Sequence, residues 1–510
     1  MLKRVRHDDG RAVKFSVSLA TLAGLALLLA LVAFARPLDH DESQYVAATM
    51  LARHALVYRD FAYLQTPLQP ILLAPLAVAA GTLAFPALRL ANALFGTITA
   101  MFVLAASRAA GARPAAALRS ALLLASTDIF LFSATIARND MLPAMLLAAA
   151  LWLLVKQARG DGGRMAAMAI GLLLSAATAT KLSYAIPALA VGALAMIDRR
   201  YRPAWLIAGA IPPALLVACT WHAAPDAFAF DVLRFPTAAP EQYYTAGRAW
   251  KLAWWARALD VTKFLALGPA LLALIVVVRA PRRDRPARTA LTHLLDLLIV
   301  AGLIAALLPA PTWRQYLLPA LPPLFVRLAL LWEARPPGRA TRIATVVFVI
   351  AGIAPSLVAV TQGFPLATAI ENGSRLKGAM DRDDVRAPIA TLSPQFVAAT
   401  GRQLDPRFAA GPFFFRSSGL LPFADEARFK LVSRARARSA VSADPPAAIL
   451  IGGEGEWTSG DARLDRAMAQ IATVAGYRPR PVTGTPFTLF VRPRSPRAPA
   501  ADRAPIDNKR

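Results

Sequence analysis

The chain has 510 residues, of which 56% are hydrophobic and 17% are charged. Apolar runs of roughly 17–25 residues recur along its first two thirds, and a run of that length spans a bilayer as a helix. We therefore expect a polytopic membrane protein and not a soluble domain. The formal net charge of +26 does not indicate nucleic-acid binding, because the basic residues sit in short loops between the apolar runs. The one cysteine, Cys219, excludes a disulfide framework and a cysteine-based zinc site.

The amino terminus reads MLKRVRHDDGRAVK and continues into an apolar run that ends at Ala33-Phe34-Ala35. This pattern allows a cleaved signal peptide, but the run of about 20 residues is longer than the usual apolar core of such a peptide. We favour an uncleaved first span. Either interpretation puts the next stretch, LDHDESQY at 38–45, on the far side of the membrane.

About eleven segments are apolar and long enough to be predicted spans. In chain order they are residues 15–35, 87–107, 118–136, 141–155, 165–180, 182–197, 204–221, 261–278, 291–308, 315–332 and 343–361.

One more apolar stretch, residues 67–80, decides the topology. It is short and carries Pro67, Pro70 and Pro75, which interrupt helical hydrogen bonding. If it does not cross, the amino terminus and all strongly basic loops fall on the cytoplasmic side, as the positive-inside rule requires. These loops are 108–119, 156–164, 199–202, 279–288 and 335–342. We therefore predict an interfacial or re-entrant helix within a long outer loop, 36–86.

Hydrophobicity drops after residue 361. We expect residues 1–361 to form the transmembrane part, residues 362–493 a small soluble α/β domain, and residues 494–510 a disordered tail. Within the α/β domain the pattern predicts strands at 388–392, 447–451 and 487–491 and a helix at 464–475.

In this topology polar residues gather at the outer face, where ionisable groups usually face a cavity or a partner. They are Asp39, Asp41, Glu42, Asp128, Arg138, Asn139, Asp140, Lys181, Arg314 and Tyr316. Cations can neutralise a lipid phosphate, and a carboxylate can take a proton from an attacking hydroxyl. Such a set suits the transfer of a sugar from a lipid phosphate to an acceptor hydroxyl.

Four stretches resemble the C-type glycosyltransferase superfamily (GT-C), in order along about the first 335 residues. They are DHDESQYVAATMLARHALVYRDFAYLQTPLQP, FPALRLANALFGTITAMFVLAA, SATIARNDMLPAMLLAAALWLL and RQYLLPALPPLFV. The chain is similar to protein O-mannosyltransferases, to the transferase that adds aminoarabinose to lipid A, and to rhizobial lipopolysaccharide uronosyltransferases. The resemblance implies a GT-C fold, polyprenyl-phosphate sugar donors and a reaction that inverts the anomeric centre.

The resemblance implies that Asp41 is the catalytic carboxylate, that Glu42 is the adjacent acid and that Asp140 is the second acid. Lys181 and Arg314 match cations that hold the lipid phosphate, and we add Arg138 and Tyr316 to this donor site. The lipid A enzyme has a Lys-Pro-Pro motif at the interfacial helix, whereas this chain has Gln65-Thr66-Pro67-Leu68 and lacks that lysine.

Simpler explanations exist for each of these residues. Asp41 and Gln44 fit a capping box of a helix over 42–54, Glu42 suits a helix N-terminus, and Asp140 suits another cap. Lys181 and Arg314 could be interfacial anchors at helix ends. Asp39 and His40 are expected to be solvated loop residues. No cofactor is certain, although Asp41, Glu42 and Asp140 could hold a divalent metal ion.

We therefore expect a multi-pass protein of the bacterial inner membrane, with a cytoplasmic amino terminus and a periplasmic active site and α/β domain. It would move a sugar from a polyprenyl-phosphate donor to a glycolipid, a lipopolysaccharide or a protein. A transporter or flippase of lipid-linked glycans is the main alternative. That class needs polar residues near the membrane midplane, whereas the strongest polar cluster here lies at the outer edge.

Overall fold

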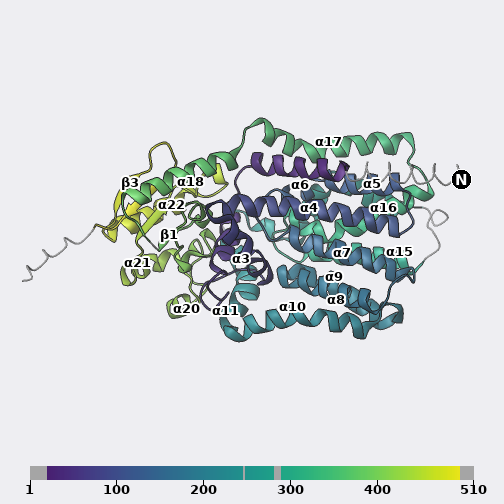
Figure 1. Ribbon diagram of the computed structural model, residues 1–510, viewed down its shortest axis with the longest axis horizontal. Coiled ribbons are helices and arrows are strands. Elements are labelled where there is room, and N and C mark those ends of the chain that lie inside the picture. The colour runs from purple at the N-terminus through teal and green to yellow at the C-terminus, as the bar shows by residue number, and fades with distance from the viewer. Residues whose placement is uncertain (1–19, 245–246, 281–288, 387, 494–510) are drawn as a thin grey trace, which may run out of the picture.

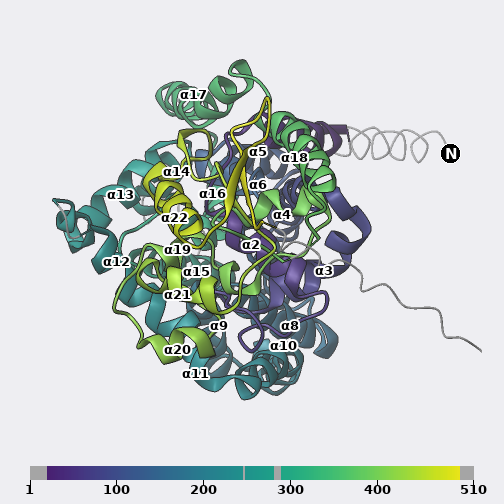
Figure 2. The same ribbon diagram turned by 90° about the vertical axis from the view of Figure 1, so that its left-hand side faces the viewer.

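The computed structural model of the protein describes residues 20–244, 247–280, 289–386 and 388–493. The tail predicted at 494–510 and the start of the first predicted span lie outside these residues. Helices run side by side along the long axis of the molecule, and a small sheet lies at one end of them (Figure 1). Seen from that end, the sheet and α22 lie in front of the helices (Figure 2).

The helices of the bundle follow the predicted spans closely. They are Ala20–Ala35, α4 (Ala84–Ala109), α5 (Pro114–Ala125), α6 (Asp128–Ala134), α7 (Met141–Ala158), α8 (Arg164–Thr180), α9 (Ala185–Ile197), α10 (Pro203–Ala223), α13 (Trp254–Ala266), α14 (Ala270–Arg279), α15 (Ala290–Leu307), α16 (Leu321–Ala334) and α17 (Arg339–Thr361). Among the described residues, 6 helical stretches are long and apolar enough to cross a membrane, or up to 8 if bent pairs count as single spans. Three more apolar helices are shorter, so the count of eleven stays a prediction.

Two predicted spans, 118–136 and 261–278, are each broken into two helices. The axes of α5 and α6 meet at 71°, and those of α13 and α14 at 103°. Thr127 begins α6 by accepting a hydrogen bond from the backbone N–H of Phe130 at 3.3 Å. Gly268 lies in the second break with a φ of +130°, and a Cβ there would be 2.7 Å from the Cα of Thr127. The two breaks therefore touch each other, and only glycine fits at their contact.

Shorter helices lie outside these bundle helices. They are α2 (Glu42–Leu51), α3 (Leu68–Ala80), α11 (Pro225–Ala229), the π-helical turn η4 (Phe230–Arg234), α12 (Phe235–Tyr244), α18 (Pro365–Arg382), α19 (Pro412–Phe415), α20 (Phe423–Arg428), α21 (Arg434–Ala443) and α22 (Ala462–Val474). Short 3-10 helices are η1 (Gly81–Leu83), η2 (Leu182–Tyr184), η3 (Arg199–Tyr201), η5 (Ala249–Leu252), η6 (Arg314–Ala320), η7 (Pro394–Phe396), η8 (Ala398–Thr400), η9 (Pro406–Phe408) and η10 (Glu456–Thr458).

The sheet has the strand order β1-β2-β4-β3. Its strands are β1 (Ile389–Thr391), β2 (Ala448–Ile451), β3 (Arg478–Pro481) and β4 (Thr488–Val491), and β1–β2 is its parallel pair. The three predicted strands are confirmed, and so is the helix, as α22. We did not predict β3, because its sequence Arg-Pro-Arg-Pro has low strand propensity. Proline is tolerated there because β3 is an edge strand.

The basic loops that the structure describes, 108–119, 156–164, 199–202 and 335–342, lie together at the end of the bundle away from the sheet (Figure 1). The backbone N–H of Arg113 donates to Glu333 at 3.0 Å. Arg159 lies against Gly111, and Gln157 donates to the carbonyl of Arg200 at 2.6 Å. The prediction that these loops share one side of the membrane agrees with this arrangement.

The outer loop starts and ends at the same level of the bundle. Arg89, in the second turn of α4, donates to the carbonyl of Ala33 at 2.8 Å and to that of Arg36 at 3.0 Å. The chain between them, including α3, therefore makes no net crossing. This agrees with the prediction that residues 67–80 do not cross the membrane. The segment is not separate from the bundle, however, because α3, η1 and α4 form one continuous helical stretch from Leu68 to Ala109.

One apolar cluster joins the outer loop to the carboxy-terminal α/β region, which we define as residues 365–493. It includes Tyr45 and Phe61 of the loop together with Phe396, Phe414 and Phe487 of the α/β region. At Gly411 a Cβ would lie 2.8 Å from the Oγ atom of Ser43 in α2. The α/β region and the outer loop thus share a core, which fixes the region over the loop that carries Asp41.

Candidate active site

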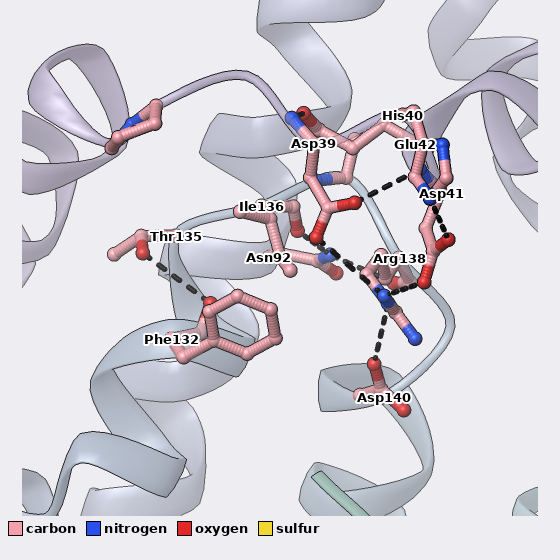
Figure 3. Close-up of polar contacts among 12 residues, drawn as sticks. Asp39, His40, Asp41, Glu42, Asn92, Phe132, Thr135, Ile136, Arg138 and Asp140 are labelled. Carbon is pink, nitrogen blue, oxygen red and sulfur yellow. Dashed lines mark hydrogen bonds and ion pairs between the residues drawn. The ribbon is translucent and has the colours of Figure 1, made fainter. Parts of the chain in front are cut away.

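Two loops meet at the sheet end of the bundle. One loop leads from the first helix into α2 and carries Asp39, His40 and Asp41. The other connects α6 to α7 and carries Arg138 and Asp140. The guanidinium of Arg138 lies among three carboxylates (Figure 3): it forms an ion pair with Asp41, its Nε atom is 3.2 Å from Asp140, and its terminal nitrogen is 3.6 Å from Asp39.

Asn92 of α4 holds the second loop in place. Its amide nitrogen donates to the carbonyl oxygens of Ile136 at 2.5 Å and Arg138 at 2.8 Å. Asn92 and Arg89 are three residues apart and thus face the same way on α4. We did not single out either residue from the sequence, although two polar residues on one face of an apolar helix are a usable signal.

Asp41 is the most exposed carboxylate of the group around Arg138. Its side chain is 25% exposed, against 19% for Asp39 and 0% for Asp140. Asp41 precedes α2 but makes no side-chain cap, so the capping-box interpretation is wrong, and α2 ends at Leu51, earlier than predicted. Burial alone would raise the pKa of Asp41, but Arg138 and then His40 outweigh it and hold the pKa well below its usual range. Asp41 is therefore ionised and accessible.

Glu42 has a different environment from Asp41. Its side chain is fully buried and accepts hydrogen bonds from Arg89 at 2.7 and 2.5 Å and from the backbone N–H of Ala137 at 2.6 Å. A further bond comes from the backbone N–H of Asp39 at 3.0 Å. Glu42 thus ties both loops to α4, and this geometry favours a positioning role over contact with substrate.

Asp140 and Lys181 form a buried ion pair below Arg138. Asp140 precedes α7 without a side-chain cap, so the capping interpretation is wrong here as well. Lys181, between α8 and η2, lies with its Nζ atom 4.9 Å from the ring centroid of Tyr316. Burial lowers the pKa of Lys181, and the partly compensating charge comes from Asp140. The structure thus brings Arg138, Lys181 and Tyr316 to the carboxylates, as expected.

Arg314 is placed differently. It pairs with Asp128 at 2.7 Å, and its guanidinium carbon is 3.7 Å from the ring centroid of Phe132. Arg36, 5.9 Å from the same ring, donates to Ser356 at 2.8 Å. Arg314, which we expected beside Asp41, therefore belongs to a neighbouring group of charged residues around Phe132.

His40 is the main residue whose place we misjudged. The interpretation of Asp39 and His40 as solvated loop residues is wrong, because each side chain is only 19% exposed. The Nε2 atom of His40 is 3.1 Å from Asp41, and its Nδ1 atom is 3.5 Å from Glu454 of the α/β region. Burial lowers the pKa of His40, but its bonds to Asp41 and Glu454 outweigh burial and raise it to about 10. No local sequence signal joins Glu454 to His40.

A divalent metal ion does not fit these residues as they stand. Among the described residues, the group that offers ligand atoms close together is Asp39, His40 and Asp41, within 4.8 Å of one another, and not Asp41, Glu42 and Asp140. Arg138 already lies against Asp39 and Asp41, and His40 is a cation between two carboxylates. An ion would have to displace both positive charges, so we derive no step through a metal.

These features define a helical membrane protein of the GT-C fold, with a charged site between the bundle and its α/β region. The fold is similar to that of ArnT, the lipid A aminoarabinose transferase, from Cupriavidus metallidurans. The structure of ArnT bound to undecaprenyl phosphate is 16% identical, with a TM-score of 0.56 over 93% of this chain and 97% of that chain. Its apo structure is 14% identical, with a TM-score of 0.57 over the same shares. No protein-family model and no curated protein matches the sequence.

Proposed function

We propose that the protein is a glycosyltransferase that moves a sugar from a polyprenyl-phosphate donor to an acceptor hydroxyl, with inversion at the anomeric carbon. The observation that carries this proposal is the accessible, ionised Asp41 beside buried cations at the end of a GT-C bundle. The similar ArnT structure contains undecaprenyl phosphate, a lipid of the required kind.

In the proposed reaction the acceptor oxygen attacks the anomeric carbon, and the bond from that carbon to the phosphate oxygen breaks. Asp41 takes the proton of the acceptor hydroxyl, and the polyprenyl phosphate leaves with the bonding electron pair. Arg138 and Lys181, with Tyr316 beside them, stabilise the charge that develops on the phosphate. Asp140 holds both cations in place.

The low pKa of Asp41 makes it a weak base in the empty site. A phosphate bound near Arg138 would compete for this guanidinium and so weaken its pull on Asp41. Donor binding would therefore raise the basicity of Asp41 at the moment it is needed. Glu42 holds the two loops in place through its bonds to Arg89 and Ala137. Arg314 has no direct part in this reaction, because it pairs with Asp128 in the neighbouring group around Phe132.

The proposed orientation follows the charges. The end with the basic loops would face the cytoplasm, and the site with the α/β region would face the periplasm of a bacterial inner membrane. The acceptor would be a glycolipid, a lipopolysaccharide or a protein. A transporter or flippase of lipid-linked glycans is the alternative, and the position of the charged site on loops at one end of the bundle favours the enzyme.

The test uses the purified full-length protein with polyprenyl-phosphate sugars of several kinds. We expect release of free polyprenyl phosphate together with a product of inverted anomeric configuration, both strongly reduced with Asp41→Asn. In proteoliposomes, movement of a fluorescent lipid-linked glycan between leaflets without sugar transfer would instead support the transporter.

A further inference from the structure

Arg416 is a cation of the α/β region that lies beside the site and forms no ion pair with a described residue. It follows α19, and its guanidinium carbon is 3.8 Å from the ring centroid of Tyr243 and 5.2 Å from that of Phe413. Its Nε atom is buried and has no hydrogen-bond acceptor. Among the residues that the structure describes, no carboxylate forms an ion pair with it.

One aromatic ring links the guanidinium to the residues around Asp41. Phe413 packs against His40 with ring centroids 5.6 Å apart, so one ring contacts both His40 and Arg416. After burial, which acts in the opposite direction, the cations that lower the pKa of Asp41 are Arg138, His40 and Arg416, in that order. Arg416 thus approaches Asp41 from the α/β region, while Arg138 approaches it from the bundle.

The other cations of the site are already paired. Arg138 is held by Asp41 and Asp140, Lys181 by Asp140, and Arg314 by Asp128. The side chain of Arg416 is only partly buried, but its Nε atom is fully buried, and a buried donor without an acceptor is costly because it gives up its hydration and gains no partner. A bound anion would supply the missing acceptor, and the planar fork of arginine matches the oxygens of a phosphate.

The aromatic rings hold the guanidinium ready for an anion. The hydroxyl of Tyr243 donates to the carbonyl of Phe413 at 2.5 Å and lies 3.3 Å from the hydroxyl of Ser417. Tyr243 belongs to α12, so the outer loop before α13 and the α/β region together fix the position of Arg416. The residue therefore does not need to reorganise when an anion arrives.

We propose that Arg416 binds the phosphate of the polyprenyl-phosphate substrate, so that the α/β region supplies part of the donor site. This inference rests on the proposed function and assigns it a residue outside the transmembrane bundle. The chain lacks, at Gln65-Thr66-Pro67, the lysine that the lipid A enzyme has at its interfacial helix. Arg416 would supply the phosphate with a cation from the α/β region in place of that lysine.

The test measures binding of undecaprenyl phosphate to the purified full-length protein in detergent, with undecaprenol and inorganic phosphate as comparison ligands. For Arg416→Gln we expect about 10- to 100-fold weaker binding of undecaprenyl phosphate, because one charged hydrogen-bond donor is lost. Binding of undecaprenol should not change. Arg463→Gln, an exposed arginine of the same region, is the matched control and should bind as the wild type does.

The outcomes separate the two proposals. If the wild type does not distinguish undecaprenyl phosphate from undecaprenol, the proposed function fails. If the wild type does distinguish them and Arg416→Gln binds equally well, only the role of Arg416 fails. Competition by inorganic phosphate at similar concentrations would mean that a free anion, and not a lipid headgroup, is the ligand. Should Arg416→Gln not fold, Arg416→Met keeps the packing on the two rings without the charge, and wild-type affinity in this variant overturns the proposal.

Discussion

The carboxylate of Glu454 lies 3.5 Å from the Nδ1 atom of His40, whose other ring nitrogen is 3.1 Å from Asp41. An acid of the α/β region thus reaches, through one imidazole, the carboxylate that the outer loop presents. The hydroxyl of Ser393 donates to the other oxygen of Glu454 at 3.1 Å and keeps it in place. The α/β region is therefore part of the electrostatic environment of Asp41.

Replacing Asp41 with asparagine should leave the protein folded but remove most transferase activity. The side chain makes no cap hydrogen bond, so α2 loses none. Loss of a general base lowers turnover by roughly 10²–10⁴-fold. Turnover is measured with a polyprenyl-phosphate sugar, and Asp444→Asn, at an exposed aspartate, serves as the control. Near-normal turnover of Asp41→Asn would remove Asp41 from the reaction.

Replacing Arg89 with methionine should strongly destabilise the protein. Glu42 would remain fully buried without its partner, and breaking such a pair costs about 3–5 kcal/mol. The melting temperature in detergent measures this, and the double variant with Glu42→Gln should recover part of the loss. Arg59→Met, at an exposed ion pair, should leave the melting temperature unchanged. Equal effects of Arg89→Met and Arg59→Met would contradict the positioning role of Glu42.

The difference in stability between the wild type and Glu454→Gln should depend on pH. The folded-state pKa of His40, about 10, is above its unfolded value of about 6.5. The stabilisation of the folded protein by charged His40 is therefore complete below about pH 6.5 and is lost as the pH rises through about 10. Because Glu454→Gln weakens one of the two bonds, the gap in melting temperature should be largest at low pH and close above pH 10. A gap that does not change with pH would mean that His40 is not charged.

Replacing Lys181 with methionine should weaken donor binding at least about tenfold, because a buried charge beside the proposed phosphate is removed. Arg314→Lys should mainly lower the melting temperature, because lysine does not reproduce the stacking of Arg314 on Phe132. Donor affinity of both variants is compared by titration with undecaprenyl phosphate. Equal losses of affinity would show that Arg314 also contacts the phosphate.

Cysteines placed in the basic loops should not be labelled from the periplasmic side. Gly111 and Gly160 have φ values of +108° and +88°, so cysteine would be strained there, and Ala115 and Asp161 are better positions. The variants are made in a Cys219→Ser background, because Cys219 is exposed. A cysteine at Gly419, in the α/β region, is also strained, so Ser418 provides the outer control. Outside labelling at Ala115 and Asp161 would reverse the proposed orientation.

The sequence by itself determined the features that depend on local composition. Apolar runs predict helices that cross a membrane, because each residue adds a fixed rise and a fixed transfer energy. The short apolar runs at 447–451 and 487–491, rich in β-branched and aromatic residues, likewise predict β2 and β4. The acidic stretch directly after the first apolar run indicated a polar site at the outer face, and the resemblance to GT-C enzymes singled out Asp41 within it. We missed the bends at Thr127 and Gly268, although Thr127-Asp128 is a helix-start signal and Gly268-Pro269 is a helix-breaking pair.

Only the tertiary structure decided which charges meet. Arg138 pairs with Asp41 and Asp140, and Lys181 pairs with Asp140. Arg314 pairs instead with Asp128. No spacing along the chain distinguishes these pairings. Glu454 and Arg416 reach Asp41 because the α/β region shares an apolar core with the outer loop. Such contacts join residues hundreds of positions apart, so they depend on how whole elements pack and leave no periodic trace in the sequence.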